Sequence, residues 1–202
     1  TIILGMRLYD ATGDEMYLDW AKDLYEWEKA NLVDPTNGEV WDNIQLIDGN
    51  PVIQKDWVFT YNMGTWIGAG LRLYNETGEQ RYLDDALLSA RTTLTSPKLT
   101  TQGVLRDEGQ GDGGLFKGIL VRYFTELTLE EDISDEDFND FLDFLVFNGE
   151  TFYRNGLSHP GMLSSPDWRN PPPDRVDLKT QLSGIMLVEA LAKLEAEGLL
   201  TE

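Results

Sequence analysis

Two stretches of this chain carry nearly the same sequence, 65 residues apart. Residues 5–21 align with residues 70–86 without a gap, and ten of the seventeen positions are identical. Each copy has apolar residues at helical spacing on both sides of a Thr-Gly pair, and a glycine after such a run is a signal that ends a helix. A repeat of fixed period is typical of an array of like units that bury their apolar faces against their neighbours. The sequence therefore predicts an array of helical hairpins.

The alternation of helix, tight turn, helix and long loop continues along the chain. Apolar periodicity and turn residues predict seven helices, at about residues 1–11, 14–30, 62–75, 79–94 and 115–127, then after Ser134 as N-cap, and at 176–197. The first long loop carries signals for a short hairpin, around 40–44 and 52–53. We expect an all-α fold, a toroid of helical hairpins that is present only in part and forms a single domain over residues 1–202. Tight turns would lie on one rim and long loops on the other, where a site can form.

The balance of charged residues limits the kinds of partner. Lys and Arg number 16 against 36 Asp and Glu, which gives a net charge of −20. No basic stripe is available for a phosphate backbone, so we expect no nucleic acid partner, and an anionic membrane surface is disfavoured. No stretch of the sequence is long and apolar enough to span a bilayer. The absence of cysteine leaves the compartment open, extracellular or cytoplasmic.

Several kinds of catalytic or metal site are excluded by residue type. The chain has no Cys and a single histidine, His159, so Cys nucleophiles, a His-based triad and multi-His metal sites are not available. The acids between residues 130 and 143 lack the spacing of a calcium loop. We expect neither metal nor cofactor. Asp84-Asp85 is rejected as a catalytic pair, because it lies inside a hairpin's second helix, where neighbouring side chains point about 100° apart; we expect a solvated first turn there.

Two long loops end in residues suited to a polar ligand. Tyr61 and Asn62 lie at the start of the expected third helix, where free backbone N–H groups and an amide can meet ligand oxygens. The alternative makes Asn62 an N-cap and Tyr61 a packing residue. Asp112 follows glycines just before the expected fifth helix, either as a sugar-contacting carboxylate or as an N-cap. A nucleotide site is disfavoured, because no Gly-Lys-Ser/Thr sequence follows these glycines.

Tryptophans gather around the long loops. Trp41, Trp57, Trp66 and Trp168 lie on these loops or next to them. Aromatic faces beside carboxylates and amides suit pyranose rings, which have apolar C–H faces and hydroxyl edges. Packing in the core is the alternative role for each of these side chains. The pattern therefore favours a sugar ligand.

Four segments occur in a characteristic order and spacing. They are Arg7–Asp14 with Tyr17-Leu18, then Thr60–Gly64, then Leu71–Tyr74 with Thr77-Gly78, and finally Phe116–Tyr123. This ordered set resembles glycoside hydrolase family 76, the endo-α-1,6-mannanase-like proteins. The resemblance implies an (α/α)6 barrel of twelve helices, an oligo- or polysaccharide of α-mannose as partner, and hydrolysis of α-mannosidic linkages with retention. The candidate substrate-side residues are Tyr61, Asn62, Asp112 and Lys117, which match family motifs near the sugar cleft, together with Trp57 and Trp41.

The chain departs from the family where catalysis is concerned. The resemblance implies an Asp-Asp pair on the segment that leads into the helix ending Tyr-Asp-x-Thr-Gly-Asp, which here is the helix of Tyr9 and Asp10. Residues 1–4 read as the middle of a helix, so we expect this pair upstream of Thr1. Retaining hydrolysis requires two carboxyl groups. We therefore assign no catalytic residue and expect the C-terminal portion of a mannan hydrolase, inactive as this chain.

Two other interpretations stay open. A non-catalytic glycan-binding protein would keep the cleft and the loop tryptophans and lack the acids. Another α/α-toroid enzyme, such as a sugar epimerase or an unsaturated-uronide hydrolase, is a further alternative, although such epimerases use histidines for proton transfer and His159 is alone. Seven helices of a ring leave an apolar hairpin face uncovered, so we also expect self-association or an N-terminal companion fragment.

Overall fold

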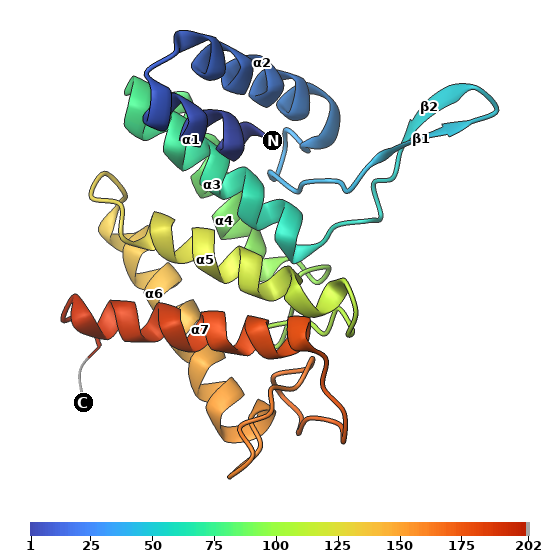
Figure 1. Ribbon diagram of the computed structural model, residues 1–202, viewed down its shortest axis with the longest axis vertical. Helices are drawn as coiled ribbons and strands as arrows, with labels where there is room; N and C mark the ends of the chain where they lie inside the picture. Colours follow the sequence, from blue (N-terminus) through green and yellow to red (C-terminus); the bar gives the residue numbers. More distant parts are fainter. Residues whose placement is uncertain (201–202) are drawn as a thin grey trace.

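Each copy of the 65-residue repeat forms a helical hairpin (Figure 1). In the computed structural model, which describes residues 1–200, these hairpins are α1 (Ile2–Thr12) with α2 (Glu15–Leu32), and α3 (Thr60–Thr77) with α4 (Gln80–Thr95). Both turn at a left-handed glycine, Gly13 and Gly78, each with φ 68°. Glycine is favoured there because it has no Cβ to clash in this conformation. The hairpins predicted from the repeat are confirmed.

A second glycine of the repeat lets the two helices of each hairpin lie close together. A Cβ built on Gly70 would stand 2.7 Å from the backbone oxygen of Tyr82, and one on Gly5 would stand 3.2 Å from that of Tyr17. The repeat aligns the two glycines with each other and the two tyrosines with each other. Residues shared by the two copies therefore include those that set the distance between paired helices.

Three more helices follow, so that residues 1–200 contain seven α-helices. They are α5 (Phe116–Thr128), α6 (Asp135–Thr151) and α7 (Leu178–Ala196), with a 3₁₀ turn η1 (Gly113–Leu115) before α5 and a π-helical turn η2 (Phe152–Gly156) after α6. The Ser134 hydroxyl accepts a hydrogen bond from the Asp137 N–H at 3.1 Å, as expected for the N-cap of α6. The helix bounds lie within two residues of the predicted ones.

The first long loop contains a β-hairpin that is displaced from the predicted one. Strand β1 (Ile44–Ile47) pairs antiparallel with β2 (Asn50–Ile53), whereas the sequence suggested 40–44 for the first strand. Asp48 and Gly49 both have positive φ, 51° and 79°, and this two-residue turn sets the observed register. A second short hairpin, too short to leave a periodic pattern in the sequence, consists of β3 (Thr100–Thr101) and β4 (Val104–Leu105).

The helices form two layers with different rims (Figure 1). Helices α1, α3, α5 and α7 lie side by side in one layer, each in contact with the next, while α4 and α6 pack behind them and α2 packs along α1 at the end of the layer. The tight turns between paired helices gather at one rim, and the long loops, including the β1–β2 hairpin, gather at the other (Figure 1). This separation was expected from the alternation of short and long connections, and it leaves the long-loop rim free to carry a site.

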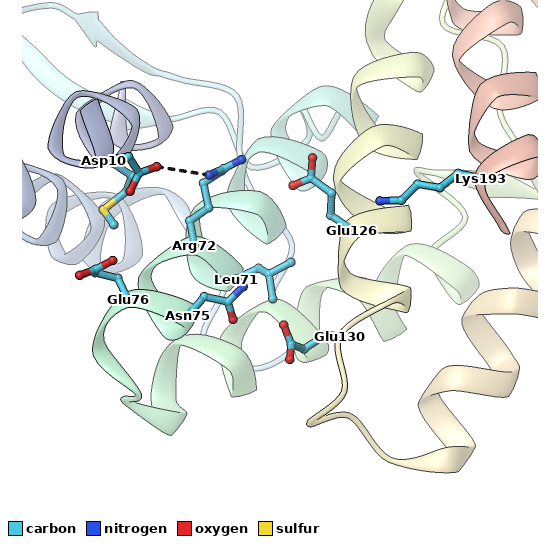
Figure 2. A pocket seen from close by; sticks show the side chains of 9 residues that line it. Asp10, Leu71, Arg72, Asn75, Glu76, Glu126, Glu130 and Lys193 are labelled. Atoms are coloured by element: carbon cyan, nitrogen blue, oxygen red, sulfur yellow. Dashed lines mark ion pairs between the residues drawn. The ribbon is translucent and has the colours of Figure 1, made fainter. Parts of the chain in front are cut away.

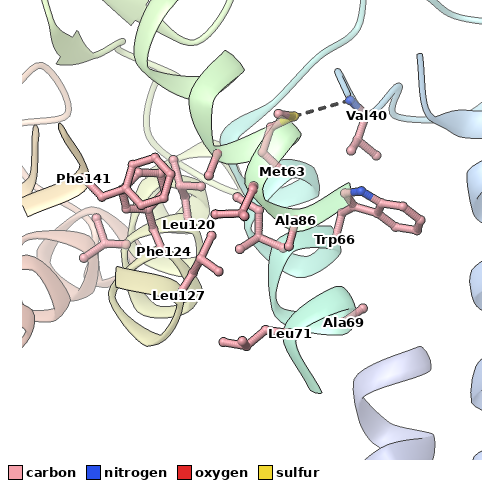
Figure 3. Close-up of a cluster of buried hydrophobic side chains, with 14 of the residues drawn as sticks. Val40, Met63, Trp66, Ala69, Leu71, Ala86, Leu120, Phe124, Leu127 and Phe141 are labelled. Carbon is pink, nitrogen blue, oxygen red and sulfur yellow. Dashed lines mark hydrogen bonds between the residues drawn. The ribbon is translucent and has the colours of Figure 1, made fainter. Parts of the chain in front are cut away.

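Helix α3 lies in the centre of the core and is buried on nearly every side (Figure 3). Its Gly64 faces the backbone of α5, where an added Cβ would stand 2.5 Å from Leu120 Cα. On another face, the Trp66 ring stacks on Tyr25 of α2 with centroids 4.1 Å apart. Trp66 and Trp168 are both fully buried, at 1% and 0% exposure, so core packing is the correct interpretation for these two tryptophans.

Candidate functional site

Asp42 lies at the centre of a hydrogen-bonded cluster at the long-loop rim. Its Oδ1 accepts hydrogen bonds from the Tyr61 hydroxyl and from Asn62 Nδ2, the latter at 3.1 Å. Its Oδ2 accepts one from Asn43 Nδ2 at 2.7 Å. Within residues 1–200, the buried Oδ1 of Asn43 has no hydrogen-bond partner. The cluster joins the first long loop to the first turn of α3 and leaves one acceptor atom unused.

The cluster holds Asp42 in its ionised form. Burial acts to raise the pKa of the Asp42 carboxyl, but the hydrogen bonds from Tyr61, Asn62 and Asn43 outweigh it, so the pKa lies below its ordinary value. Burial and the neighbouring Asp42 carboxylate together raise the pKa of Tyr61 to about 12, which keeps its hydroxyl a donor. An ionised acceptor beside hydroxyl and amide donors matches the hydroxyl groups of a sugar.

A pocket of about 370 Å³ opens beside Tyr61. It is lined by Tyr61, Asp112, Leu115, Phe116, Ile119 and Lys179. The rings of Tyr61 and Phe116 lie with centroids 4.4 Å apart and form part of an apolar wall. Asp112 is paired with Lys179 of α7, and its side chain is 87% exposed. This ion pair lowers the pKa of Asp112. Two residues predicted from separate loops, Tyr61 and Asp112, thus line the same pocket.

The start of α3 presents Tyr61 and Asn62 to this site. The N-cap residue of α3 is Phe59, whose side chain has no hydrogen-bond acceptor, and not Asn62 as the alternative interpretation had it. Glu108, from the loop between β4 and η1, takes that role: its Oε1 accepts from the Thr60 N–H at 2.9 Å, and its Oε2 accepts from the Thr60 hydroxyl. Sequence reasoning missed Glu108, because the two partners are 48 residues apart.

Lys117 matches a family motif, but its ammonium group points into protein rather than into the pocket. It is only 2% exposed, donates to the backbone oxygen of Pro166, and lies 4.7 Å from the centre of the Trp168 ring. Burial lowers the pKa of Lys117 to about 8, although nearby carboxylates, Glu108 first among them, act against this. In this arrangement Lys117 fixes the loop before α7 to the start of α5.

The two loop tryptophans predicted for the site have different surroundings. Trp41 is buried, at 6% exposure, and Lys55 Nζ lies 4.4 Å from its ring centre. Trp57 is 46% exposed, and its backbone oxygen accepts a hydrogen bond from the Asp42 N–H at 2.8 Å. Both residues therefore flank Asp42 along the chain or through the backbone. As substrate contacts they stay predictions, and the exposed Trp57 ring is the better placed of the two.

Asp84 and Asp85 lie away from this rim, on α4. Asp85 Oδ2 accepts hydrogen bonds from Tyr25 at 3.0 Å and from Lys29 at 2.6 Å, both on α2. Asp84 is exposed, as expected of a solvated first turn, and accepts a hydrogen bond from Gln80 at 3.1 Å, whereas Asp85 is partly buried and ion-paired rather than solvated. Asp84-Asp85 is the only pair of adjacent aspartates in the sequence.

A second cavity, of about 300 Å³, lies at the tight-turn rim (Figure 2). It is lined by charged residues from the ends of α1, α3, α5 and α7, among them Asp10, Arg72, Glu126 and Lys193. Arg72 forms an ion pair with Asp10 at 3.9 Å. The residues predicted for sugar binding line the opposite rim, so this cavity is not part of the candidate site.

The structure gives two further findings about residues 1–200. No helix among them combines the length and the apolar character needed to cross a bilayer. Within the same residues, no three carboxylate or histidine side chains gather closely enough to hold a metal ion.

Solved structures of known proteins share this fold. The α-1,6-mannanase GH76A from Salegentibacter sp. HEL1_6 superimposes with a TM-score of 0.93 and 54% identity, over 96% of this chain and 57% of that one. Inactive variants of that enzyme, with two aspartates replaced, have been solved in complex with α-1,6-mannotetrose and α-1,6-mannotriose. The protein Lin0763 from Listeria innocua superimposes with a TM-score of 0.87 and 37% identity, over 100% of this chain and 56% of that one.

Sequence relatives with a described activity also match. The mannan endo-1,6-alpha-mannosidase DCW1 of Saccharomyces cerevisiae is 37% identical over 79 residues, which cover 37% of this chain and 17% of the relative. The protein of the same name from Candida glabrata is 34% identical over 77 residues, with the same coverage. This chain thus spans less than two thirds of the length of each of these relatives. Residues 1–198 match the family model for glycosyl hydrolase family 76, and the chain belongs to that family.

Proposed function

We propose that the long-loop rim of this chain binds α-1,6-linked mannose residues of mannan, and that the chain contributes this binding site to their hydrolysis with retention. Family membership and the activities named for its relatives support the substrate class. The observation that carries the proposal is the ionised Asp42, which lies beside two donors, Tyr61 and Asn62, next to a pocket with an aromatic wall.

Each group of the site has a definite role in this proposal. Asp42 accepts hydrogen bonds from sugar hydroxyls, while the Asn62 amide and the Tyr61 hydroxyl keep the carboxylate ionised and in place. The rings of Tyr61 and Phe116 pack against the C–H face of a mannose ring. Asp112 and Lys179 offer an acceptor and a donor at the open side of the pocket.

The acid and the nucleophile are not assigned to residues of this chain. Retaining hydrolysis uses two carboxyl groups about 5 Å apart on either side of the scissile bond. Of the only adjacent aspartates, Asp85 belongs to the α2–α4 interface and Asp84 is exposed on α4, and neither lines the pocket. We therefore propose that the 202-residue chain binds the glycan and does not cleave it.

Calorimetry with α-1,6-mannotriose tests this function, with cellotriose as the control ligand. Saturable binding of the mannotriose alone is expected, together with no release of reducing ends from α-1,6-mannan. An absence of binding heat at high ligand concentration would contradict the proposed site. Release of reducing ends by the purified chain would overturn the assignment of catalysis to residues outside it.

A non-catalytic glycan-binding protein is the second candidate, and the engagement of Asp85 with Tyr25 and Lys29 favours it. The two functions separate when the chain is mixed with the part of the Salegentibacter mannanase that it does not match. Hydrolysis of mannan by the mixture supports the hydrolase, whereas binding without hydrolysis supports the binding protein.

The exposed apolar face of α2 is the surface we propose for self-association. It consists of Met16, Trp20, Leu24 and Trp27, all at least 40% exposed. The repeat aligns these residues with Arg81, Asp85, Ser89 and Thr92 of α4. Each of those four contacts α2 or the loop after it, through Glu26, Tyr25 with Lys29, Gly38 and Asn37 respectively. Because the equivalent residues of α4 contact a neighbouring hairpin, we expect the α2 face to pack against another hairpin as well, here one from a second copy of the chain.

Giving α2 the polar residues of α4 is expected to abolish this association. The variant combines Trp20→Asp with Trp27→Thr, which removes the two largest apolar side chains of the face without touching the core. Light scattering should find oligomers of the unmodified chain and monomers of the variant. Trp57→Asp, which changes an exposed tryptophan of the first long loop outside the α2 face, serves as the control, and this variant should stay associated. A monodisperse monomer of the unmodified chain would rule the proposal out.

A further inference from the structure

We infer that Glu108 is a positioning residue of the candidate sugar site: it caps the start of α3 from a separate loop, and so holds Tyr61 and Asn62 in the orientation that reaches Asp42. The inference rests on the proposed function of that site, which it deepens by adding a residue that does not line the pocket. It concerns how the binding groups are held, rather than which groups touch the sugar.

Helix α3 begins without a side-chain acceptor from its own N-cap residue. The first N–H groups of a helix need acceptors from outside the helix. Helices α2, α6 and α7 obtain one from their own N-cap residues, Asp14, Ser134 and Asp177. The N-cap of α3 is a phenylalanine, and the acceptor comes instead from Glu108, which binds the Thr60 N–H and the Thr60 hydroxyl with its two oxygens.

The loop that carries Glu108 is held by close packing and by hydrogen bonds. A Cβ built on Gly113 would stand 1.9 Å from the backbone oxygen of Glu108, so the chain folds back on itself here with no room for a larger residue. Gln110, two residues after Glu108, joins this loop to the segment before α7. Its Nε2 donates to the backbone oxygen of Arg175 at 3.1 Å, and its Oε1 accepts from the Asp177 N–H at 2.8 Å. The Glu108 carboxylate therefore lies on a loop that is held in place.

Thr60 lies directly before the two binding groups of α3. Tyr61 and Asn62 follow it directly, and both side chains reach the same oxygen of Asp42. Helix ends fray when their free backbone groups are not held. A displacement of about 1 Å in a binding group is enough to weaken its hydrogen bonds strongly. Holding Thr60 thus holds the geometry of the Asp42 cluster.

Burial separates the titration of Glu108 from that of Asp42. Burial raises the pKa of Glu108, and the hydrogen bonds from Thr60 and the cations Arg106 and Lys117 offset part of this rise. Arg106 lies on the same loop and Lys117 on α5, while the Glu108 carboxylate contributes to the raised pKa of Tyr61 on α3. As the pH falls, Glu108 takes up its proton before Asp42, whose pKa lies below its ordinary value. On acidification, sugar binding should therefore begin to weaken as Glu108 is protonated, while Asp42 is still ionised.

The variant Glu108→Gln tests the inference in two ways, with and without sugar. Without sugar, the NMR signals of the Thr60 amide and of the Asn62 side-chain amide should shift and broaden, and the pH titration of the Thr60 amide should disappear. With α-1,6-mannotriose, the affinity should fall by about tenfold, as for the loss of a helix cap transmitted to the binding groups. Thr60→Val, which keeps the backbone N–H and removes one of the two bonds, should produce a smaller loss of the same kind and serves if the first variant does not fold.

Glu39→Gln is the matched control. Glu39 is 8% exposed and binds Ser96 at 2.8 Å and Lys98 at 2.8 Å, so its replacement also removes a buried carboxylate. The control should lower stability and leave the Thr60 and Asn62 signals and the affinity unchanged. Unchanged Thr60 and Asn62 signals in Glu108→Gln, or an affinity equal to that of the unmodified chain, would overturn the positioning role. Shifted signals in a chain that binds no mannotriose would support the positioning role and contradict the proposed function instead.

Discussion

Replacing Gly64 with alanine is expected to destabilise the chain by about 1–3 kcal/mol, as is typical of overpacking in a well-packed core. The added Cβ would stand 2.5 Å from Leu120 Cα and 3.0 Å from the backbone oxygen of Ile119. These are backbone atoms, so α5 itself has to move away from α3. The intrinsic helix preference for alanine over glycine offsets only about 1 kcal/mol of this cost.

Denaturant unfolding of the variant measures this effect, and Gly5→Ala provides the control. Gly5 also lies within a helix, but its nearest contact is 3.2 Å, from the backbone oxygen of Tyr17, so small shifts suffice. The control is expected to change the free energy of unfolding by less than about 1 kcal/mol, since the gain in helix preference balances the contact. Equal stability of Gly64→Ala and the unmodified chain would contradict the close packing of α3 on α5.

Replacing Asp42 with asparagine is expected to weaken binding of α-1,6-mannotriose by about 30- to 150-fold, the effect of losing roughly 2–3 kcal/mol of charge-assisted hydrogen bonding. The amide keeps the shape of the side chain but loses the charge and one acceptor. Tyr61 offers a readout that requires no sugar, because part of its raised pKa comes from the Asp42 carboxylate. Its pKa should fall from about 12 toward its ordinary value, as followed by ultraviolet titration of tyrosine.

Asp112→Asn is the matched control for Asp42→Asn. Asp112 lines the same pocket, but its carboxylate is exposed and paired with Lys179 at the surface, where ion pairs contribute little. Its replacement should weaken binding by less than about fivefold. If both variants bind alike, or if Asp42→Asn binds as tightly as the unmodified chain, the Asp42 cluster is not the main contact with the sugar.

The first four helices and their turns were predictable because the repeat contains the same helical hairpin in two copies. The Thr-Gly pairs that end α1 and α3, and the glycines that bring paired helices together, recur at the same offset. The predicted start of the first strand of the β1–β2 hairpin was wrong by four residues. Apolar residues on both sides of Asp48-Gly49 leave the alternation of apolar and polar residues ambiguous. The turn, rather than the strand pattern, decides the pairing there.

The candidate site was predictable only in part. Tyr61 and Asn62 could be found because the start of a helix after a long loop is a recognisable place for ligand contacts. Asp42 could not, since it meets them only after the β1–β2 hairpin has folded back and Trp57 has bound the Asp42 backbone N–H. For Lys117 the motif is evident in the sequence, but the surroundings of the side chain are not. Its burial against Trp168 depends on a loop about 50 residues away.

A crystal structure of this chain with α-1,6-mannotriose would show whether the long-loop rim binds the sugar. We expect a mannose ring in the pocket at the long-loop rim, with a hydroxyl group within hydrogen-bond distance of Asp42 and the ring face against Tyr61 or Phe116. A sugar bound instead in the charged cavity at the tight-turn rim, or a long-loop rim without sugar in crystals saturated with the ligand, would contradict this expectation.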